Sequence, residues 1–341
     1  MQALKTLMAL LITVAALVVV AGVAGWLWFQ AELAKDGPHG TVQDFTVSQG
    51  EGFSTVAERL QVSGVVHRSD VLRLQARLQG VESQIKAGRY QIPARASALA
   101  VLDQIVSGDV VQLRLTIPEG LTTAQILARV EATDVLTGDM PDTEFTEGIF
   151  LPDTYVFGEG LTRTQFLTLM QDAQTKLIRS LWPQRQAGLP YDGPDDALIM
   201  ASIVEKETGL AGERAKIAGL FVGRLKKRMR LQTDPTVIYG VSGGEPLYNR
   251  RGERRTLFQS ELDRVTPWNT YQIDGLPATP ICNPGRLAIE AALNPADTDY
   301  VYFVADGKGG HLFAKTLAEH NRNVAAYRRY EDAEIARERS N

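Results

Sequence analysis

Two glutamates, Glu205 and Glu207, are the first candidates for chemistry, because a carboxyl group can both give and take a proton. They lie near the end of a helix that we expect to begin at Pro194, since proline suits the first turn of a helix. Glu205 closes a small and mostly apolar helix face made by Leu198, Ala201 and Ser202. A carboxyl group there is partly desolvated and near the negative end of the helix, which favours the protonated form that a general acid needs. We therefore predict Glu205 as the acid, and we expect Glu207 to face solvent on the opposite side.

The competing interpretation is that Glu205 is an ordinary surface residue paired with a lysine or arginine, which is the commoner situation for a glutamate. The segments that follow weigh against it, because they gather amide, hydroxyl, carboxylate and phenol groups. Planar amides both donate and accept hydrogen bonds, and aromatic faces stack on the apolar side of a sugar ring. These segments indicate a sugar-binding cleft. The residues that we predict to contact the substrate are Gln232, Thr233, Asp234, Tyr248, Asn249, Asn269 and Tyr271.

The composition argues against several classes of protein. The 341-residue chain has a net charge of −4, so its overall charge does not favour nucleic acid as a partner. Its single cysteine, Cys282, cannot form an intrachain disulfide, and neither a CxxC nor an HExxH motif is present. We expect no metal and no cofactor. The sequence also lacks a glycine pattern suited to binding phosphate, and it offers no serine and histidine pair with a clear third partner, as a serine hydrolase would need.

Eleven lysines and arginines lie between Arg214 and Arg255, and two interpretations of them stay open. The simpler one is a solvated helix face followed by a basic loop. The other is the attraction of an acidic polymer, such as a glycan that carries lactyl and peptide carboxylates.

The N-terminal region predicts a single membrane anchor. Residues 7–29 form a run of 23 residues without a charge, about 35 Å as a helix, which is enough to cross a bilayer. Lys5 precedes the run, while Trp26 and Trp28 lie at its far end like an interfacial aromatic belt. We expect residues 1–6 in the cytoplasm and the rest of the chain outside the cytoplasmic (inner) membrane. The alternative is a cleaved signal peptide, but the apolar run is longer than a usual signal core.

A small α+β module follows a linker over residues 30–42. Alternating and helical patterns predict the order strand, helix, helix, strand between Phe45 and Ile92, within a region spanning 43–131. This order resembles a LysM-like domain, a fold associated with binding N-acetylglucosamine-containing glycans. A spacer domain without a ligand is the alternative.

Residues 148–332 are expected to form a mainly helical catalytic domain. The segments 300–304 and 312–313 read as a short β-hairpin, and a closing helix follows from Thr316 to Arg329. The fold class predicted for the whole chain is α+β, with one N-terminal transmembrane helix.

Several segments together resemble the YceG-like (MltG) family, the endolytic murein transglycosylases. The matching stretches are FLPDTYVF (150–157), ASIVEKET (201–208), RLQTDPTVIYG (230–240), WNTY (268–271), GLPATPICNPG (275–285), YFVADGKGGHLF (302–313) and EHN (319–321). The resemblance covers essentially the whole chain. Its one visible departure is Ala278-Thr279, where the family usually has Pro-Gly.

The resemblance implies a membrane-anchored enzyme that cuts peptidoglycan strands internally, with Glu205 as the acid/base by match to ASIVEKET. It also implies that the substrate supplies its own nucleophile, the C6 hydroxyl of muramic acid. Glu205 would protonate the glycosidic oxygen and then accept the C6 proton, leaving a 1,6-anhydromuramoyl end. This route needs only one carboxylate, and Glu205 has no partner carboxylate on its own helix face. The implied partners are peptidoglycan strands, with peptidoglycan synthases as further candidates.

Two other functions stay open. A hydrolytic muramidase would use Asp234 or Glu207 as a second carboxylate. A non-catalytic, glycan-binding scaffold for cell-wall synthesis would cleave nothing.

Overall fold

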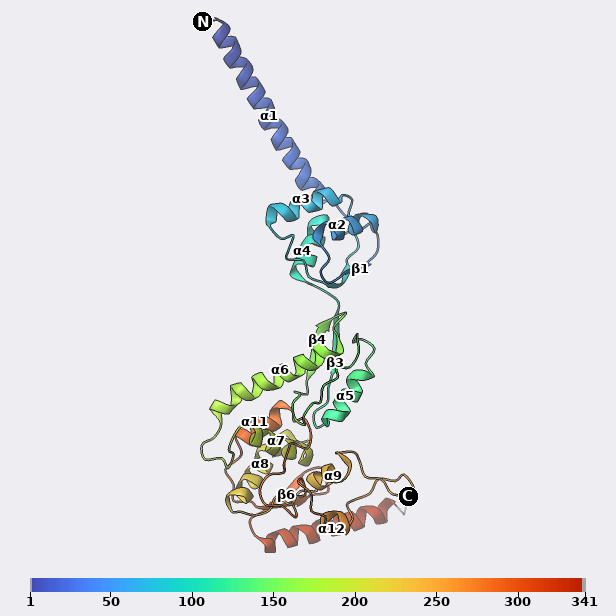
Figure 1. Ribbon diagram of the computed structural model, residues 1–341, viewed down its shortest axis with the longest axis vertical. Coiled ribbons are helices and arrows are strands. Elements are labelled where there is room, and N and C mark those ends of the chain that lie inside the picture. The colour runs from blue at the N-terminus through green and yellow to red at the C-terminus, as the bar shows by residue number, and fades with distance from the viewer. Residues whose placement is uncertain (1, 339–341) are drawn as a thin grey trace. The chain divides into compact units, whose positions relative to one another are not determined.

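The computed structural model describes residues 2–338, which fold into helices and three two-stranded sheets (Figure 1). Contacts between elements divide the chain into two compact units, Met1–Leu113 with Val156–Gly160, and Arg114–Tyr155 with Leu161–Asn341. The first division lies within the predicted region 43–131, so residues 114–131 group with the second unit. The two units are described separately below.

An apolar helix, α1 (Gln2–Ala34), begins the first unit. Its segment Leu4–Ala34 is long and apolar enough to cross a membrane, as predicted for residues 7–29. The helix continues five residues into the predicted linker. The reason is packing, since Phe29 and Leu33 lie one turn apart and are buried against Val71.

The rest of the first unit has the predicted order of strand, helix, helix and strand. Its elements are β1 (Gln43–Val47), α2 (Phe53–Val62), α3 (Ser69–Gln79), β2 (Gly88–Ile92) and α4 (Ala98–Ser107). β1 and β2 pair antiparallel, with Phe45 opposite Tyr90. Both aromatic side chains are buried in one core with Leu60, Leu72 and the apolar face of α4.

A second sheet joins β3 (Gln112–Thr116) to β4 (Thr154–Gly158), and the division between the units passes through both strands. On the side of the second unit, the hydroxyls of Thr116 and Thr154 lie 2.9 Å apart. The turn after β3 carries Glu119, which becomes important at the site.

The second unit is mainly helical and closes with the predicted hairpin. Its elements are α5 (Thr123–Glu131), α6 (Arg163–Leu181), the 3-10 helix η1 (Trp182–Gln184), α7 (Pro194–Glu207), α8 (Ala211–Lys226), α9 (Asp234–Ser242), α10 (Gln259–Leu262), α11 (Arg286–Leu293), β5 (Tyr302–Ala305), β6 (His311–Ala314) and α12 (Leu317–Glu338). β5 and β6 pair antiparallel, with Ala305 opposite His311.

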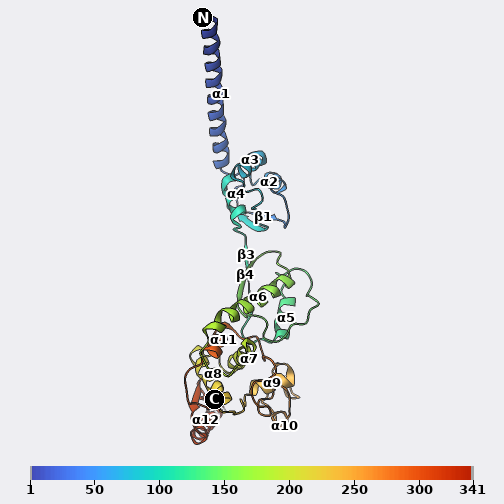
Figure 2. The same cartoon turned by 60° about the vertical axis from the view of Figure 1, so that its left-hand side comes forward.

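Helix α7 is the centre of this unit and lies beside α8 and α11 in both views (Figure 1, Figure 2). Most of its length is fully buried in one apolar cluster, including Met200, Ala201, Ile203 and Val204. Its charged side chains lie at its two ends, at Asp195 and Asp196 in the first turn and at residues 205–207 in the last. The core therefore fixes the backbone that presents both glutamates.

Candidate active site

A polar pocket of about 470 Å³ lies at the C-terminal end of α7. Four of the seven predicted substrate contacts line it, namely Gln232, Thr233, Asp234 and Tyr271. The other lining residues are Glu207, Arg224, Tyr302, Phe303, Leu317 and His320. Glu205 is not among them, so the pocket is organised around the other glutamate of the helix.

The carboxyl group of Glu207 is enclosed by the segment that precedes α9. The Thr233 hydroxyl donates a hydrogen bond to its Oε1. The pKa of Glu207 is raised to about 7, chiefly by burial and also by the charge of Asp234, while the Thr233 hydrogen bond and the charges of His311 and Arg224 oppose the rise. Glu207 is half-buried in the wall of this pocket, so the prediction that it faces solvent holds only in part, because residues remote in sequence cover part of that side of the helix. A carboxyl group that titrates near pH 7 suits general acid/base chemistry.

Two of the predicted substrate contacts, Gln232 and Tyr271, present polar groups to this pocket. The backbone of Gln232 is strained, and the hydroxyl of Tyr271 is hydrogen-bonded. Gln232 has a φ of 48°, in the left-handed region that non-glycine residues rarely adopt, and its side chain is exposed. The Tyr271 hydroxyl donates to Asp234 Oδ1 at 2.6 Å, and burial raises the pKa of Tyr271. Asp234 begins helix α9, with Pro235 in its first turn, rather than forming an isolated turn.

Sequence reasoning missed two further residues of the pocket, Arg224 and His320. Arg224 is buried, and its guanidinium donates to the carbonyl oxygens of Val301 at 2.7 Å and Leu231 at 2.6 Å, which ties the hairpin to the segment before α9. His320 stacks on Tyr302 with 5.2 Å between ring centroids. Burial and the Arg224 charge lower the pKa of His320, so the ring is neutral at pH 7. Its buried Nδ1 has no hydrogen-bond partner within the described residues.

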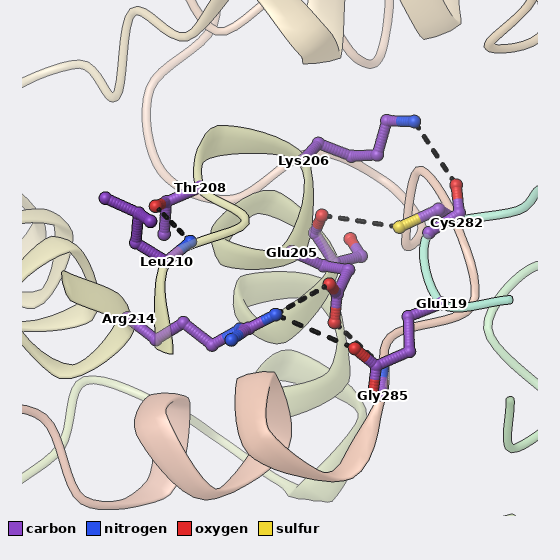
Figure 3. A network of polar contacts seen from close by, with 10 residues as sticks. Glu119, Glu205, Lys206, Thr208, Leu210, Arg214, Cys282 and Gly285 are labelled. Atoms are coloured by element: carbon purple, nitrogen blue, oxygen red, sulfur yellow. Dashed lines mark hydrogen bonds and ion pairs between the residues drawn. The ribbon is translucent and has the colours of Figure 1, made fainter. Parts of the chain in front are cut away.

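Glu205 belongs to a different cluster, shown in Figure 3. The Arg214 guanidinium lies between two carboxylates, with Nη2 3.5 Å from Glu205 Oε1 and 3.6 Å from Glu119 Oε2. The Gly285 N–H donates to Glu205 Oε2 at 3.0 Å. The side chains of Glu205 and Arg214 are 6% and 8% exposed, whereas that of Glu119 is 41% exposed.

The second carboxylate near Glu205 comes from the turn after β3, a place that the spacing within α7 could not indicate. Burial, and then the charge of Glu205, raise the pKa of Glu119, while Arg214 opposes the rise. Gly285 leaves room for Glu119, since a Cβ atom at this position would lie 1.8 Å from Glu119 Oε1 and would displace that side chain. The cluster is thus a close-packed pair of carboxylates sharing one cation.

The remaining predicted contacts, Asn269, Tyr248 and Asn249, lie outside the Glu207 pocket. Asn269 is fully buried, and its amide nitrogen donates to three backbone carbonyls while its oxygen accepts from the Tyr271 N–H. It therefore holds the loop that carries Tyr271. Tyr248 and Asn249 lie on a separate loop with its own hollow. Among residues 2–338, no group of three or more histidine, cysteine, aspartate or glutamate side chains is placed to hold a metal ion.

The model of the YceG-like family matches residues 45–326, so the chain belongs to the YceG-like family. Among curated proteins, an endolytic murein transglycosylase of Bacillus subtilis (strain 168) is 28% identical over 317 residues, covering 84% of this chain and 85% of that protein. An endolytic murein transglycosylase of Streptococcus pneumoniae serotype 2 (strain D39) is 26% identical over 324 residues, covering 82% of this chain and 57% of that longer protein. A crystal structure of a yceG-like protein from Listeria monocytogenes is 27% identical, covers 82% of this chain and 98% of that one, and superposes with a TM-score of 0.48.

Proposed function

We propose that this protein is an endolytic murein transglycosylase, a lytic enzyme that cleaves the MurNAc–GlcNAc bond within peptidoglycan strands. Membership of the YceG-like family and the names of the relatives support the substrate and the reaction class. The single observation that carries the chemistry is Glu207, whose carboxyl titrates near pH 7 on the wall of a pocket lined by amide, hydroxyl and aromatic groups.

The proposed reaction needs one carboxyl group. Glu207 gives its proton to the glycosidic oxygen as the bond from C1 to that oxygen breaks, and the GlcNAc side leaves with a hydroxyl group. The resulting carboxylate accepts the proton of the muramic acid C6 hydroxyl as O6 bonds to C1. The products are a 1,6-anhydro-MurNAc end and a free GlcNAc end, no water is consumed, and Glu207 is protonated again.

Glu205, predicted from the sequence, remains the second candidate for the acid/base. Its cluster holds a second carboxylate, Glu119, on the same guanidinium. A hydrolase uses two carboxylates, so the muramidase alternative would use Glu205 with Glu119 here, or Glu207 with Asp234 in the pocket. The geometry favours Glu207, because Glu205 is ion-paired and lies outside the pocket that holds the sugar-binding groups.

Matched variants distinguish the two glutamates. We expect Glu207→Gln to lower cleavage of purified sacculi by on the order of 10²-fold or more, because the proton donor is lost, and Glu205→Gln to retain cleavage. Mass spectrometry of the digests gives both rate and product, and circular dichroism checks that each variant is folded. Reducing ends in the wild-type digest would overturn the lytic reaction, and the reverse order of the variants would assign the chemistry to Glu205. Glycan binding without any cleavage would support the scaffold alternative.

The finer topology is part of the same proposal. Residues 7–29 within α1 would cross the cytoplasmic membrane once, with residues 1–6 inside and residues 148–332 outside, where peptidoglycan lies. Protease added to intact spheroplasts is expected to digest the second unit. Protection of that unit from the protease would show that the chain has the opposite orientation in the membrane.

The region 43–131 is proposed to include a LysM-like glycan-binding module. The order β1, α2, α3, β2 and the antiparallel pairing of the two strands support this. Retention on insoluble chitin, compared between the full chain and a variant without residues 43–92, would test it. Peptidoglycan synthases are proposed as partners, since an enzyme acting on nascent strands works where they are made, and co-purification tests this.

A further inference from the structure

The loop between α9 and α10 contains an ordered turn that carries arginines. Asn249 builds it, since its Oδ1 accepts from the backbone N–H groups of Arg251 at 2.8 Å and Glu253 at 3.0 Å. The Asn249 N–H also donates to the Glu253 carbonyl, and Gly252 supplies the positive φ of 76° that the turn requires. The turn therefore has a defined shape and holds its exposed side chains in place.

The charges on this turn are unbalanced. Arg250, Arg251 and Arg254 are exposed, and none of them forms an ion pair within the part of the chain that the structure describes. The one acid among them, Glu253, accepts a hydrogen bond from the Asn249 amide at 2.7 Å. Three free cations thus face one carboxylate that is already engaged.

Arg255, which follows these arginines in the chain, differs from them because its charge is neutralised by an ion pair. Arg255 forms two hydrogen bonds with Glu261, at 2.8 and 2.7 Å, and its guanidinium lies 4.0 Å from the centre of the Phe258 ring. The pair of Arg255 and Glu261 fixes one wall of the hollow that lies beside this turn. The arginines of the turn have no such partner and remain available to bind a ligand.

The turn borders an open hollow of about 540 Å³ with two exposed aromatic walls. Tyr248 is 57% exposed and Phe258 is 56% exposed, which is unusual for side chains with large apolar surfaces. The residues that line the hollow are Tyr248, Asn249, Arg250, Arg251, Arg255 and Phe258. Aromatic faces beside guanidinium groups suit a ligand that has both apolar ring faces and carboxylates.

We propose that this hollow, with Tyr248, Phe258, Arg250 and Arg251 in its walls and Arg254 on the adjoining turn, binds the carboxylate-bearing stem peptides of a peptidoglycan strand. The proposal rests on the proposed function, because that function supplies a glycan with acidic peptide branches as the substrate. Arginine recognises carboxylates through paired N–H donors, and the aromatic walls contact the sugar or the aliphatic parts of the peptide. The hollow would thus select strands whose stem peptides are present over strands that have lost them.

The test compares binding of two soluble glycan probes by the full chain in nanodiscs made of a zwitterionic lipid. The probes are uncrosslinked strands with their stem peptides, and the same strands after an amidase has removed the peptides. A background with both Glu205→Gln and Glu207→Gln prevents turnover during the measurement, whichever glutamate is the acid. We expect the peptide-bearing strands to bind on the order of tenfold more tightly, and the preference to shrink as salt is raised.

A charge-matched control identifies the arginines responsible. The triple variant Arg250→Gln, Arg251→Gln, Arg254→Gln should lose the preference for stem peptides. The control Arg179→Gln, Arg328→Gln, Arg329→Gln removes the same charge from exposed helix positions and should keep it. Equal melting temperatures of the two variants would show that both are folded.

The outcomes separate this proposal from the proposed function. Equal binding of the two probes by the parent protein, or equal behaviour of the two triple variants, would overturn the stem-peptide site while leaving cleavage by the wild type intact. If the triple arginine variant also lost binding to vesicles of phosphatidylglycerol, the proposal would be overturned in favour of a lipid surface as the ligand. Failure of the wild type to cleave sacculi would count against the function and not against the binding site.

Discussion

At the scale of single residues, Glu205 and Glu207 differ mainly in what covers them. They are two positions apart on α7, yet one is paired with Arg214 and the other is enclosed beside Thr233. The pKa of Glu207, raised to about 7, is the property that a pH profile reports. Because the acid must be protonated in the free enzyme, we expect kcat/KM to fall as the pH rises through about 7.

Two neighbours of Glu207 should move this falling limb in opposite directions. Thr233→Val removes a hydrogen bond that favours the ionised carboxylate, so the pKa of Glu207 rises and the limb moves to higher pH. Asp234→Asn removes a negative charge that raises the pKa, so the limb moves to lower pH. Profiles of kcat/KM for both variants provide the measurement. A limb that moves the same way in both, or in neither, would show that Glu207 is not the group that titrates.

The candidate site could be predicted from the sequence only in part, and the reason lies in side-chain surroundings. The chemistry of residues 232–234 and Tyr271 was evident from residue type, and they do share a pocket. Asn249 and Asn269 carry the same amide, but the fold uses it to build a turn and to hold a loop. The periodicity of a sequence predicts which residues share one face of a helix. It does not predict which remote segment packs against that face, so the burial of Glu207 could not be predicted.

At the scale of elements, long periodic segments were predictable and one short helix was not. The β-hairpin lies close to its predicted position, and helix α7 begins at Pro194 as predicted. Helix α9 was missed, because Asp234-Pro235 fits a turn and the first turn of a helix equally well. The helix places Asp234 at the pocket, so this local ambiguity also concealed a feature of the site.

Helix α8 must pass close to the segment after α11, and one glycine permits this. A Cβ atom on Gly219 would lie 2.2 Å from the Ala296 carbonyl oxygen, a backbone atom that cannot move cheaply. We expect Gly219→Ala to destabilise the protein by about 1–3 kcal/mol and to lower its melting temperature by a few degrees. Gly212→Ala in the same helix is the control, since nothing lies within 4 Å of its added Cβ. Thermal denaturation of the two variants should differ; equal melting temperatures would mean that α8 and this segment adjust together.

At the scale of the whole molecule, the α+β class and the N-terminal apolar helix agree with the sequence analysis, and the chain belongs to the YceG-like family. The division into two units differs from a simple succession of domains, because residues 156–160 return to the first unit. Such a return depends on the pairing of β3 with β4, and strand pairing between distant segments leaves no periodic signal in either segment.

The N-terminal helix has two parts with separate roles, and this leads to a prediction about truncation. Its first part exposes apolar side chains, whereas Phe29 and Leu33 are buried at 5% and 1% exposure against Val71. Removal of residues 1–28 should release the protein from membranes and leave the first unit intact. Removal of residues 1–34 should also release it, but the loss of two buried side chains should destabilise the first unit by about 3–6 kcal/mol. Carbonate extraction measures the release and thermal unfolding measures the stability. If both truncated proteins melted at one temperature, the last turns of α1 would act as a linker; if the shorter truncation stayed with the membrane, another surface would be the anchor.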